Sequence, residues 1–225
     1  MSTTIIYKNS FKEIITENQA QQLDLFNKRF FINGILKKIE YHSVYEGVSV
    51  TYYKDQNETN VLQNLILEYP DVTVFSIRTR EEIGNYTKEN REWFENGILK
   101  FKSIAIRDSQ RRMIAAEDFD VVTNESKGSG KSFYSESVYK MWCVPNIEGE
   151  WIDKEFNVFN AEYNDDGSLK RIDFNEMSTY DKELYLPNSE NTEYDLAILK
   201  MKCGFTDEQM NYYLTSAILP IPNFD

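Results

Sequence analysis

Residues 27–38 read Asn27-Lys-Arg-Phe-Phe-Ile-Asn-Gly-Ile-Leu-Lys-Lys38, and the chain contains nearly the same stretch twice more. The second copy is Asn90-Arg-Glu-Trp-Phe-Glu-Asn-Gly-Ile-Leu-Lys-Phe101, and a looser third copy is Asn160-Ala-Glu-Tyr-Asn-Asp-Asp-Gly-Ser-Leu-Lys-Arg171. Their first residues lie 63 and then 70 positions apart, which indicates three structural units of similar length. The shared frame consists of turn and strand residues and has no catalytic group, so it predicts architecture and leaves function open.

Each copy has at its centre a dipeptide that favours a tight β-hairpin. Asn33-Gly34 and Asn96-Gly97 suit a two-residue type I′ turn, because that turn requires a positive φ at both central residues. Asp166-Gly167 is the equivalent pair in the third copy. Alternating apolar and polar residues on both sides predict the paired strands, such as 25–32 and 35–43 in the first copy. Duplication of one unit and convergence on a common hairpin both explain the match.

The remaining pattern predicts an α+β, β-rich fold: an antiparallel sheet of meanders and three Asn/Asp-Gly hairpins, with a few helices. Apolar residues at helical spacing predict a helix from Val61 that ends before Pro70, and the capping box Thr206-Asp-Glu-Gln209 predicts one near the C-terminus. No segment has the composition of a long linker, so residues 1–225 are expected to form a single domain, with three units of roughly 65 residues around the hairpins.

Four further segments give weaker structural signals. The capping-box form of Ser10-Phe-Lys-Glu13 predicts a short helix after it. The polar, glycine-bearing stretch 124–131 predicts a loop. The sequence also predicts strands at 119–122 and 133–144, the second because it is rich in Tyr, Phe and Trp.

Composition indicates a globular protein that is cytoplasmic. The chain has 225 residues, of which 41% are hydrophobic and 28% charged. There is no apolar run of about 18 residues, so the sequence predicts no transmembrane helix and no membrane partner. The N-terminus does not resemble a secretory signal, and two cysteines, Cys143 and Cys203, do not make a disulfide framework.

The net charge of −12 is concentrated in the last third of the chain. Residues 151–225 carry 15 acidic and 6 basic side chains, which gives −9 for that segment. Such a surface disfavours nucleic acid, because binding to phosphates requires Lys and Arg. It favours a basic protein partner. The candidate partner-binding residues, chosen by charge density, are Glu162, Asp165, Asp166, Asp173, Asp181 and Glu183.

The sequence has no complete catalytic, cofactor or metal motif. Residues 128–132 imitate the end of a phosphate-binding loop, but Glu125 stands where that motif requires glycine. The segment from Glu162 to Asp173 has part of the spacing of a calcium loop, although its flanks alternate as strands; a plain hairpin and a calcium site are both compatible with it. The single histidine, His42, has no nucleophile motif to serve. We therefore expect no cofactor and no catalytic residue.

Three functions follow from this pattern. The first is a non-enzymatic protein-binding protein that acts through its sheet or its acidic C-terminal third. One form of it is a bacterial immunity protein that neutralises a cognate toxin, since a complementary charged surface speeds association. The second is a small-molecule carrier, if the aromatic-rich sheet closes into a barrel around an apolar cavity. The third is a hydrolase that uses two carboxylates.

Overall fold

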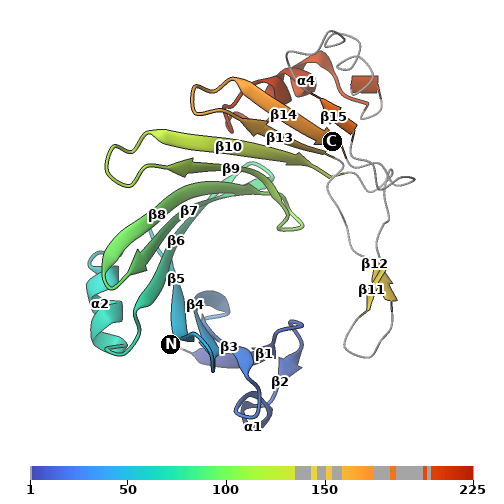
Figure 1. Ribbon diagram of the computed structural model, residues 1–225. Helices are drawn as coiled ribbons and strands as arrows, with labels where there is room; N and C mark the ends of the chain where they lie inside the picture. The colour runs from blue at the N-terminus through green and yellow to red at the C-terminus, as the bar shows by residue number, and fades with distance from the viewer. Residues whose placement is uncertain are drawn as a thin grey trace. The chain divides into compact units, whose positions relative to one another are not determined.

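A computed structural model of the chain describes residues 2–134, 143–145, 151–153, 159–174, 183–185, 200–201 and 204–224 (Figure 1). Over these residues the fold is α+β and β-rich, as predicted, with mostly antiparallel strand pairing. The chain divides into two compact units, Met1–Ser103 and Ile104–Asp225. The division into units does not test the prediction that residues 1–225 form a single domain, which stays a prediction.

The first unit is a meander followed by a crossover and a second meander. Its strands follow the order β2-β1-β3-β4-β5-β6-β7-β8 across the sheet. The pair β5–β6 is parallel, whereas β1–β3, β3–β4, β4–β5 and β6–β7 are antiparallel. The elements are β1 (Thr3–Asn9), β2 (Ile14–Ile15), α1 (Glu17–Ala20), β3 (Leu25–Ile32), β4 (Ile35–Ser43), β5 (Gly47–Lys54), α2 (Val61–Glu68), β6 (Val74–Ile83), β7 (Tyr86–Glu95) and β8 (Ile98–Arg107), which spans the unit boundary.

The two Asn-Gly hairpins have the backbone geometry that the sequence predicts. Asn33 and Gly34 have φ of 49° and 80°, and Asn96 and Gly97 have φ of 49° and 74°. Positive φ at both central residues is the mark of a type I′ turn. In the first hairpin Ile32 pairs directly with Ile35, so the turn fixes the register of β3 and β4.

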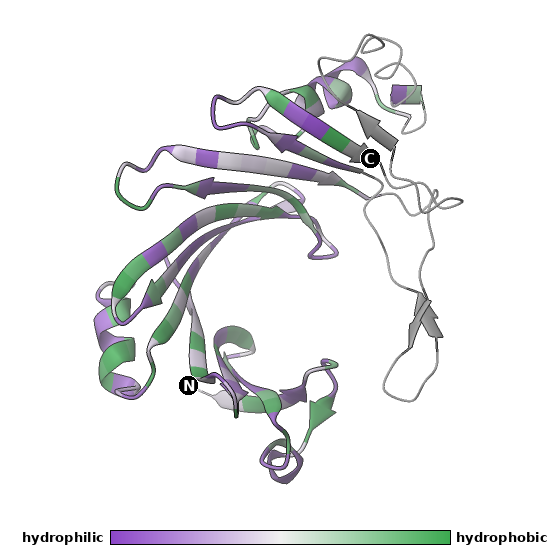
Figure 2. Cartoon of the chain, viewed as in Figure 1, coloured by the Kyte–Doolittle hydropathy of each residue, from purple (hydrophilic) through white to green (hydrophobic). Residues whose placement is uncertain are grey.

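Helix α2 covers one face of the first unit. It is the crossover between the parallel strands β5 and β6, which cannot be joined by a tight turn, and it lies beside β6 in Figure 1. Leu65 of α2 is buried against Val50, Phe75 and Ile77 of the sheet. Because successive side chains of a strand point to opposite faces, the strand neighbours of Val50, Phe75 and Ile77 lie on the face away from α2. Figure 2 shows the alternation of hydrophobic and hydrophilic residues along the strands.

The second unit contains the third hairpin and the C-terminal helix. Its strands follow the order β8-β9-β10-β13-β14-β15, and β11 pairs with β12 separately. The Asp166-Gly167 turn is longer than the Asn-Gly turns: Gly167 has φ of 81°, and the turn is closed by a bond from the Asn164 amide to the Ser168 carbonyl. The elements are β9 (Met113–Phe119), β10 (Ser126–Phe133), β11 (Cys143–Pro145), β12 (Trp151–Asp153), β13 (Phe159–Tyr163), β14 (Leu169–Phe174), β15 (Glu183–Tyr185) and α4 (Asp207–Leu214).

Both capping boxes of the structure are formed by Thr and Gln, and the one predicted at Ser10 is wrong. The side chain of Asn9 accepts from the amides of Phe11 and Glu13, which holds residues 10–13 in a turn. The helix α1 starts only after Thr16, whose hydroxyl accepts from the Gln19 amide. The predicted box at Thr206 is confirmed, and it opens α4.

The predictions for residues 119–122 and 124–131 were wrong. The expected loop at 124–131 is mostly strand β10, because pairing with β9 and β13 on both sides outweighs its low strand propensity. The expected strand at 119–122 is instead the end of β9 and a turn. Most of the expected strand at 133–144 lies outside the described residues.

A buried lysine attaches α4 to the sheet of the second unit. Lys131 of β10 is only 1% exposed, and its ammonium group donates to the carbonyl oxygens of Tyr212 and Thr215 at the C-terminal end of α4. The carbonyls at a helix C-terminus carry partial negative charge and lack partners within the helix, so a cation is favourable there. Burial nevertheless lowers the pKa of Lys131 to about 7.

Replacing Gly34 with alanine is expected to lower the free energy of unfolding by about 1–2 kcal/mol, the cost of a left-handed conformation in a residue with a Cβ. The new methyl group would meet no atom within 4 Å, so the loss would come from the backbone alone. Urea unfolding measures it. Gly130→Ala is the control, because Gly130 has no positive φ and its added Cβ would lie 3.6 Å from the Ala161 carbonyl oxygen. An equal loss in both variants would contradict the prediction.

Lys131→Met is expected to remove a pH dependence of stability between pH 7 and 9. In this range the unfolded lysine is protonated and the folded one is largely neutral, so unfolding takes up a proton. The free energy of unfolding of the wild type should therefore rise with pH relative to the variant, by at most about 1.4 kcal/mol per pH unit. Lys127→Met on the same strand is the control, since Lys127 is exposed and its pKa is raised. Parallel curves for wild type and Lys131→Met would contradict the prediction.

Candidate functional site

The structure uses two of the predicted acidic residues within their own hairpin. The Glu162 carboxylate accepts from Arg171 at 2.8 Å and lies 3.6 Å from the Lys170 ammonium group. The bond from Arg171 holds the pKa of Glu162 below its ordinary value. Asp166 accepts from the Ser168 amide and hydroxyl, which lowers its pKa and closes the turn. Much of their charge is therefore matched inside the chain.

The other predicted acidic residues are spread over the turn and the last two strands. Asp165 is exposed in the turn of the third hairpin. In the strand register, Asp173 lies opposite Asn160, and Glu183 lies opposite Phe174. Asp181 lies outside the described residues. The structure thus places five of the six on or beside β13, β14 and β15, but it does not collect them around one hollow.

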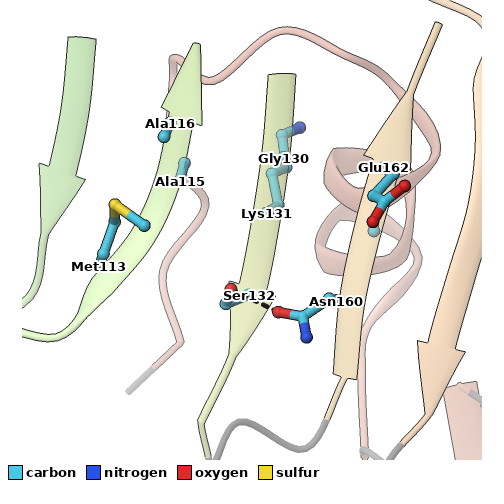
Figure 3. A pocket seen from close by; sticks show the side chains of 9 residues that line it. Met113, Ala115, Ala116, Gly130, Lys131, Ser132, Asn160 and Glu162 are labelled. Carbon is cyan, nitrogen blue, oxygen red and sulfur yellow. Dashed lines mark hydrogen bonds between the residues drawn. The ribbon is translucent and has the colours of Figure 1, made fainter. Parts of the chain in front are cut away.

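A shallow hollow lies beside Glu162 on the second unit (Figure 3). It has a volume of about 190 Å³, and Ala115, Ala116 and Gly130 line it together with a hydrogen bond from Ser132 to Asn160 of 2.7 Å. The small side chains of β9 and β10 create this space. None of the residues that line it has a buried side-chain donor or acceptor without a hydrogen-bond partner.

A group of charges in the first unit gives a stronger candidate. The Glu89 carboxylate is fully buried, and three guanidinium groups surround it: Arg78 at 3.2 Å, Arg80 at 3.0 Å and Arg91 at 2.9 Å. We call these four residues the arginine cluster. Burial alone would raise the pKa of Glu89, but the neighbouring guanidinium groups hold it below its ordinary value. The cluster therefore carries three positive charges and one negative charge.

The arginine cluster is held in place by the pairing of β6 and β7. In the antiparallel register Arg78 lies directly opposite Arg91, and Arg80 lies opposite Glu89. Two like charges in directly opposed positions destabilise a sheet unless a counter-charge is near. Glu89 supplies that counter-charge. The third arginine, Arg80, also contacts an aromatic ring: its guanidinium carbon lies 4.0 Å from the centre of the Tyr53 ring.

One donor of the cluster has no acceptor. The Nε of Arg91 donates to Glu89, whereas its Nη2 is buried and makes no hydrogen bond to any described residue. A buried donor without an acceptor costs roughly 1–3 kcal/mol, and more when the group is charged. Such groups are uncommon in folded proteins, so each one calls for an explanation.

A hollow of about 280 Å³ adjoins Arg78 and Arg91 on the face of the sheet opposite α2. Trp93 lies on this face and is 44% exposed, and Tyr41 is also exposed. Burial of its other part raises the pKa of Tyr41, so the phenol is neutral at pH 7. We call this surface the arginine face. The residues that line it are Tyr41, Ser49, Val50, Thr51, Val74, Ser76, Arg78, Arg91, Glu92, Trp93 and Phe101.

Comparison with protein-family models, with curated proteins and with solved structures gave no match to the chain. The site must therefore be interpreted from its own chemistry. Among the described residues no three His, Cys, Asp or Glu side chains are grouped so that they could hold a metal ion. None of the described helices combines the length and apolar character needed to cross a bilayer.

The arginine face is suited to binding. It offers guanidinium donors, hydroxyl groups and exposed aromatic rings in one place. Acidic charge density, by which the candidate residues were chosen, gives no indication of this surface. A usable signal was present: in Arg78-Thr-Arg80 and in Glu89-Asn-Arg91 the charged residues are two positions apart, which puts them on one face of a strand.

Glu89→Gln is expected to lower the free energy of unfolding by about 3–5 kcal/mol, because it leaves three guanidinium groups around a neutral side chain. The loss should fade in acid. A carboxylate with a lowered folded pKa stabilises the protein above its unfolded pKa of 4.5, and this contribution disappears as the pH falls through the folded value. Urea unfolding from pH 7 to pH 3 tests both points.

Glu82→Gln is the matched control, because Glu82 is on the same hairpin but is exposed and bonded only to Thr87 in the described contacts. It should change the free energy of unfolding by no more than about 0.5 kcal/mol. A Glu89→Gln protein as stable as this control at pH 7 would show that the arginine cluster does not need its carboxylate.

Proposed function

We propose that this chain is a non-enzymatic protein-binding protein that engages its partner through the arginine face. The observation that supports this most strongly is the placement of Arg91, with its unsatisfied donor, next to the exposed ring of Trp93. Trp, Tyr and Arg are the residues that most often dominate the binding energy of protein interfaces. An exposed tryptophan on a sheet face beside two arginines is therefore better explained by a contact than by stability of the unit.

The neutralisation of a toxin by an immunity protein is one form of this role, and we keep it as part of the proposal. Such a protein needs a fixed complementary surface and no catalytic groups, and charged groups at its edge speed association. The acidic hairpin is the weaker surface for this purpose because Glu162 is already paired with Arg171. The arginine face points instead to a partner that is acidic where it makes contact.

The small-molecule carrier stays an alternative, and the strand order gives it less support than protein binding. It required the aromatic-rich sheet to close into a barrel around an apolar cavity. Among the described strands β2 does not pair with β8, and β8 does not pair with β15, so neither unit closes on itself. The hollow on the arginine face is lined by charged and hydroxyl-bearing residues as well as by aromatic ones.

Trp93→Ala is expected to weaken binding of a native partner by about tenfold or more, as does the loss of a central aromatic contact in other interfaces. The full chain is used to capture proteins from its host, the captured protein is purified, and its dissociation constant is measured by calorimetry. Tyr45→Ala is the matched control, since Tyr45 is 79% exposed and belongs to the turn between β4 and β5. Equal dissociation constants for Trp93→Ala and wild type would rule out the arginine face as the contact.

A further inference from the structure

We infer that the arginine face is a receptor for a carboxylate of the partner, and that an Asp or Glu side chain of that protein occupies the hollow against Arg78 and Arg91. This inference rests on the proposed function and names the chemistry of the contact. It is based on three features of the first unit: the donors that the two guanidinium groups still carry, the one-sided compensation of their charge, and the size and lining of the hollow.

The two arginines have more donors than the chain itself uses. A guanidinium group carries five N–H donors in a fixed plane. Arg78 donates from Nε to Ser76 at 3.3 Å and from Nη1 to Glu89, and Arg91 donates from Nε to Glu89. The Nη2 of Arg91 is buried without an acceptor among the described residues. The Nη2 of Arg78 and the Nη1 of Arg91 make no hydrogen bond to the described residues and are not buried, so they remain available to a second acceptor.

A single carboxylate, that of Glu89, compensates the positive charges of Arg78 and Arg91. The two arginines lie opposite each other on β6 and β7, and Glu89 lies two positions before Arg91 on the same face of β7. The hollow adjoins the same two arginines. A carboxylate placed there would repeat the contact that Glu89 already makes, with charge-assisted bonds that are about twice as strong as neutral ones.

The hollow fits an amino-acid side chain better than a larger ligand. Its volume of about 280 Å³ is just below the range of about 300–1,000 Å³ that is typical of small-molecule sites. Ser49, Thr51 and Ser76 line it, and the Ser76 hydroxyl, which accepts from Arg78, still has a proton to donate. Trp93 can cover the apolar stem of a side chain.

The charge of the whole chain favours a single carboxylate over a polyanion. A net charge of −12 repels nucleic acid at a distance, whereas a single carboxylate interacts mainly with the charges nearest to it. In the arginine cluster three guanidinium groups face the single Glu89 carboxylate, and this excess of positive charge favours one acidic side chain even with Glu92 at the edge of the hollow. A protein that presents Asp or Glu on its surface meets both conditions.

The test uses the full chain and two defined peptides. Acetyl-Ala-Glu-Ala-amide is titrated into ¹⁵N-labelled protein while the arginine Nε–H signals and the Trp93 indole signal are followed by NMR. We expect saturable shifts of the Arg78, Arg91 and Trp93 signals, with a dissociation constant in about the millimolar range. The matching peptide with Gln in place of Glu should bind at least about tenfold more weakly, because it lacks the charge.

Variants at the two arginines then test the planar contact. Arg91→Lys and Arg78→Lys each keep the positive charge but lose the two-pronged geometry, so each should weaken binding of the Glu peptide about tenfold. Arg111→Lys is the matched control, since Arg111 is exposed in the turn between β8 and β9 and should leave binding unchanged. Urea unfolding shows which variants are folded, and one folded variant of the two is sufficient.

Three results would overturn the inference: equal binding of the Glu and Gln peptides, tighter binding of a phosphoserine peptide than of the Glu peptide by about tenfold or more, or an equal effect of Arg111→Lys. The outcomes are separable from those of the proposed function. If a captured partner depends on Trp93 but is indifferent to Arg78→Lys and Arg91→Lys, the protein-binding role stands and the carboxylate contact is wrong. If the Glu peptide binds as expected but no partner depends on Trp93, the carboxylate site stands and the protein-binding role is wrong.

Discussion

The burial of the Glu89 carboxylate is the constraint on which the candidate site depends. A charge that is removed from water must be matched by close partners, or it shifts its protonation and destabilises the fold. Here three guanidinium groups meet that need, from positions that only the pairing of β6 with β7 brings together. Since three cations surround one anion, the match leaves an excess of positive charge. The requirement that stabilises the hairpin thus also creates the surface that can attract an anionic group.

The position of α2 decides which face of the sheet is free to carry this surface. The parallel pairing of β5 and β6 requires a crossover, and the crossover helix covers the face with Val50, Phe75 and Ile77. Alternation along the strands then places Ser76 and Arg78 on the other side. An arginine cluster on the covered face would have had to share it with an apolar core. Because successive side chains of a strand point to opposite faces, the apolar core lies on one face of the sheet and the polar groups lie on the other.

Local chemistry accounts for what the sequence predicted correctly. The turns at Asn33-Gly34 and Asn96-Gly97 and the cap at Thr206 depend on neighbouring residues only, so they could be recognised from the chain. Strand β10 could not, because its glycines and serines form a strand only through pairing with β9 and β13. The arginine cluster lies between these cases. The spacing of two within each strand was visible, but the register that sets Arg78 against Arg91 depends on the whole hairpin.

Net charge and local charge give opposite indications in this protein, and distance decides between them. The value of −12 describes the chain as a whole, and it acts on an approaching partner within the Debye length of about 8 Å at physiological salt, beyond which it is largely screened. At contact distance the arginine cluster presents three guanidinium groups and one carboxylate, which is a local excess of positive charge. A strongly acidic partner would be repelled before it arrived, and a strongly basic one would be opposed at the arginine face. The surface therefore selects a partner of modest overall charge with an acidic side chain at its point of contact.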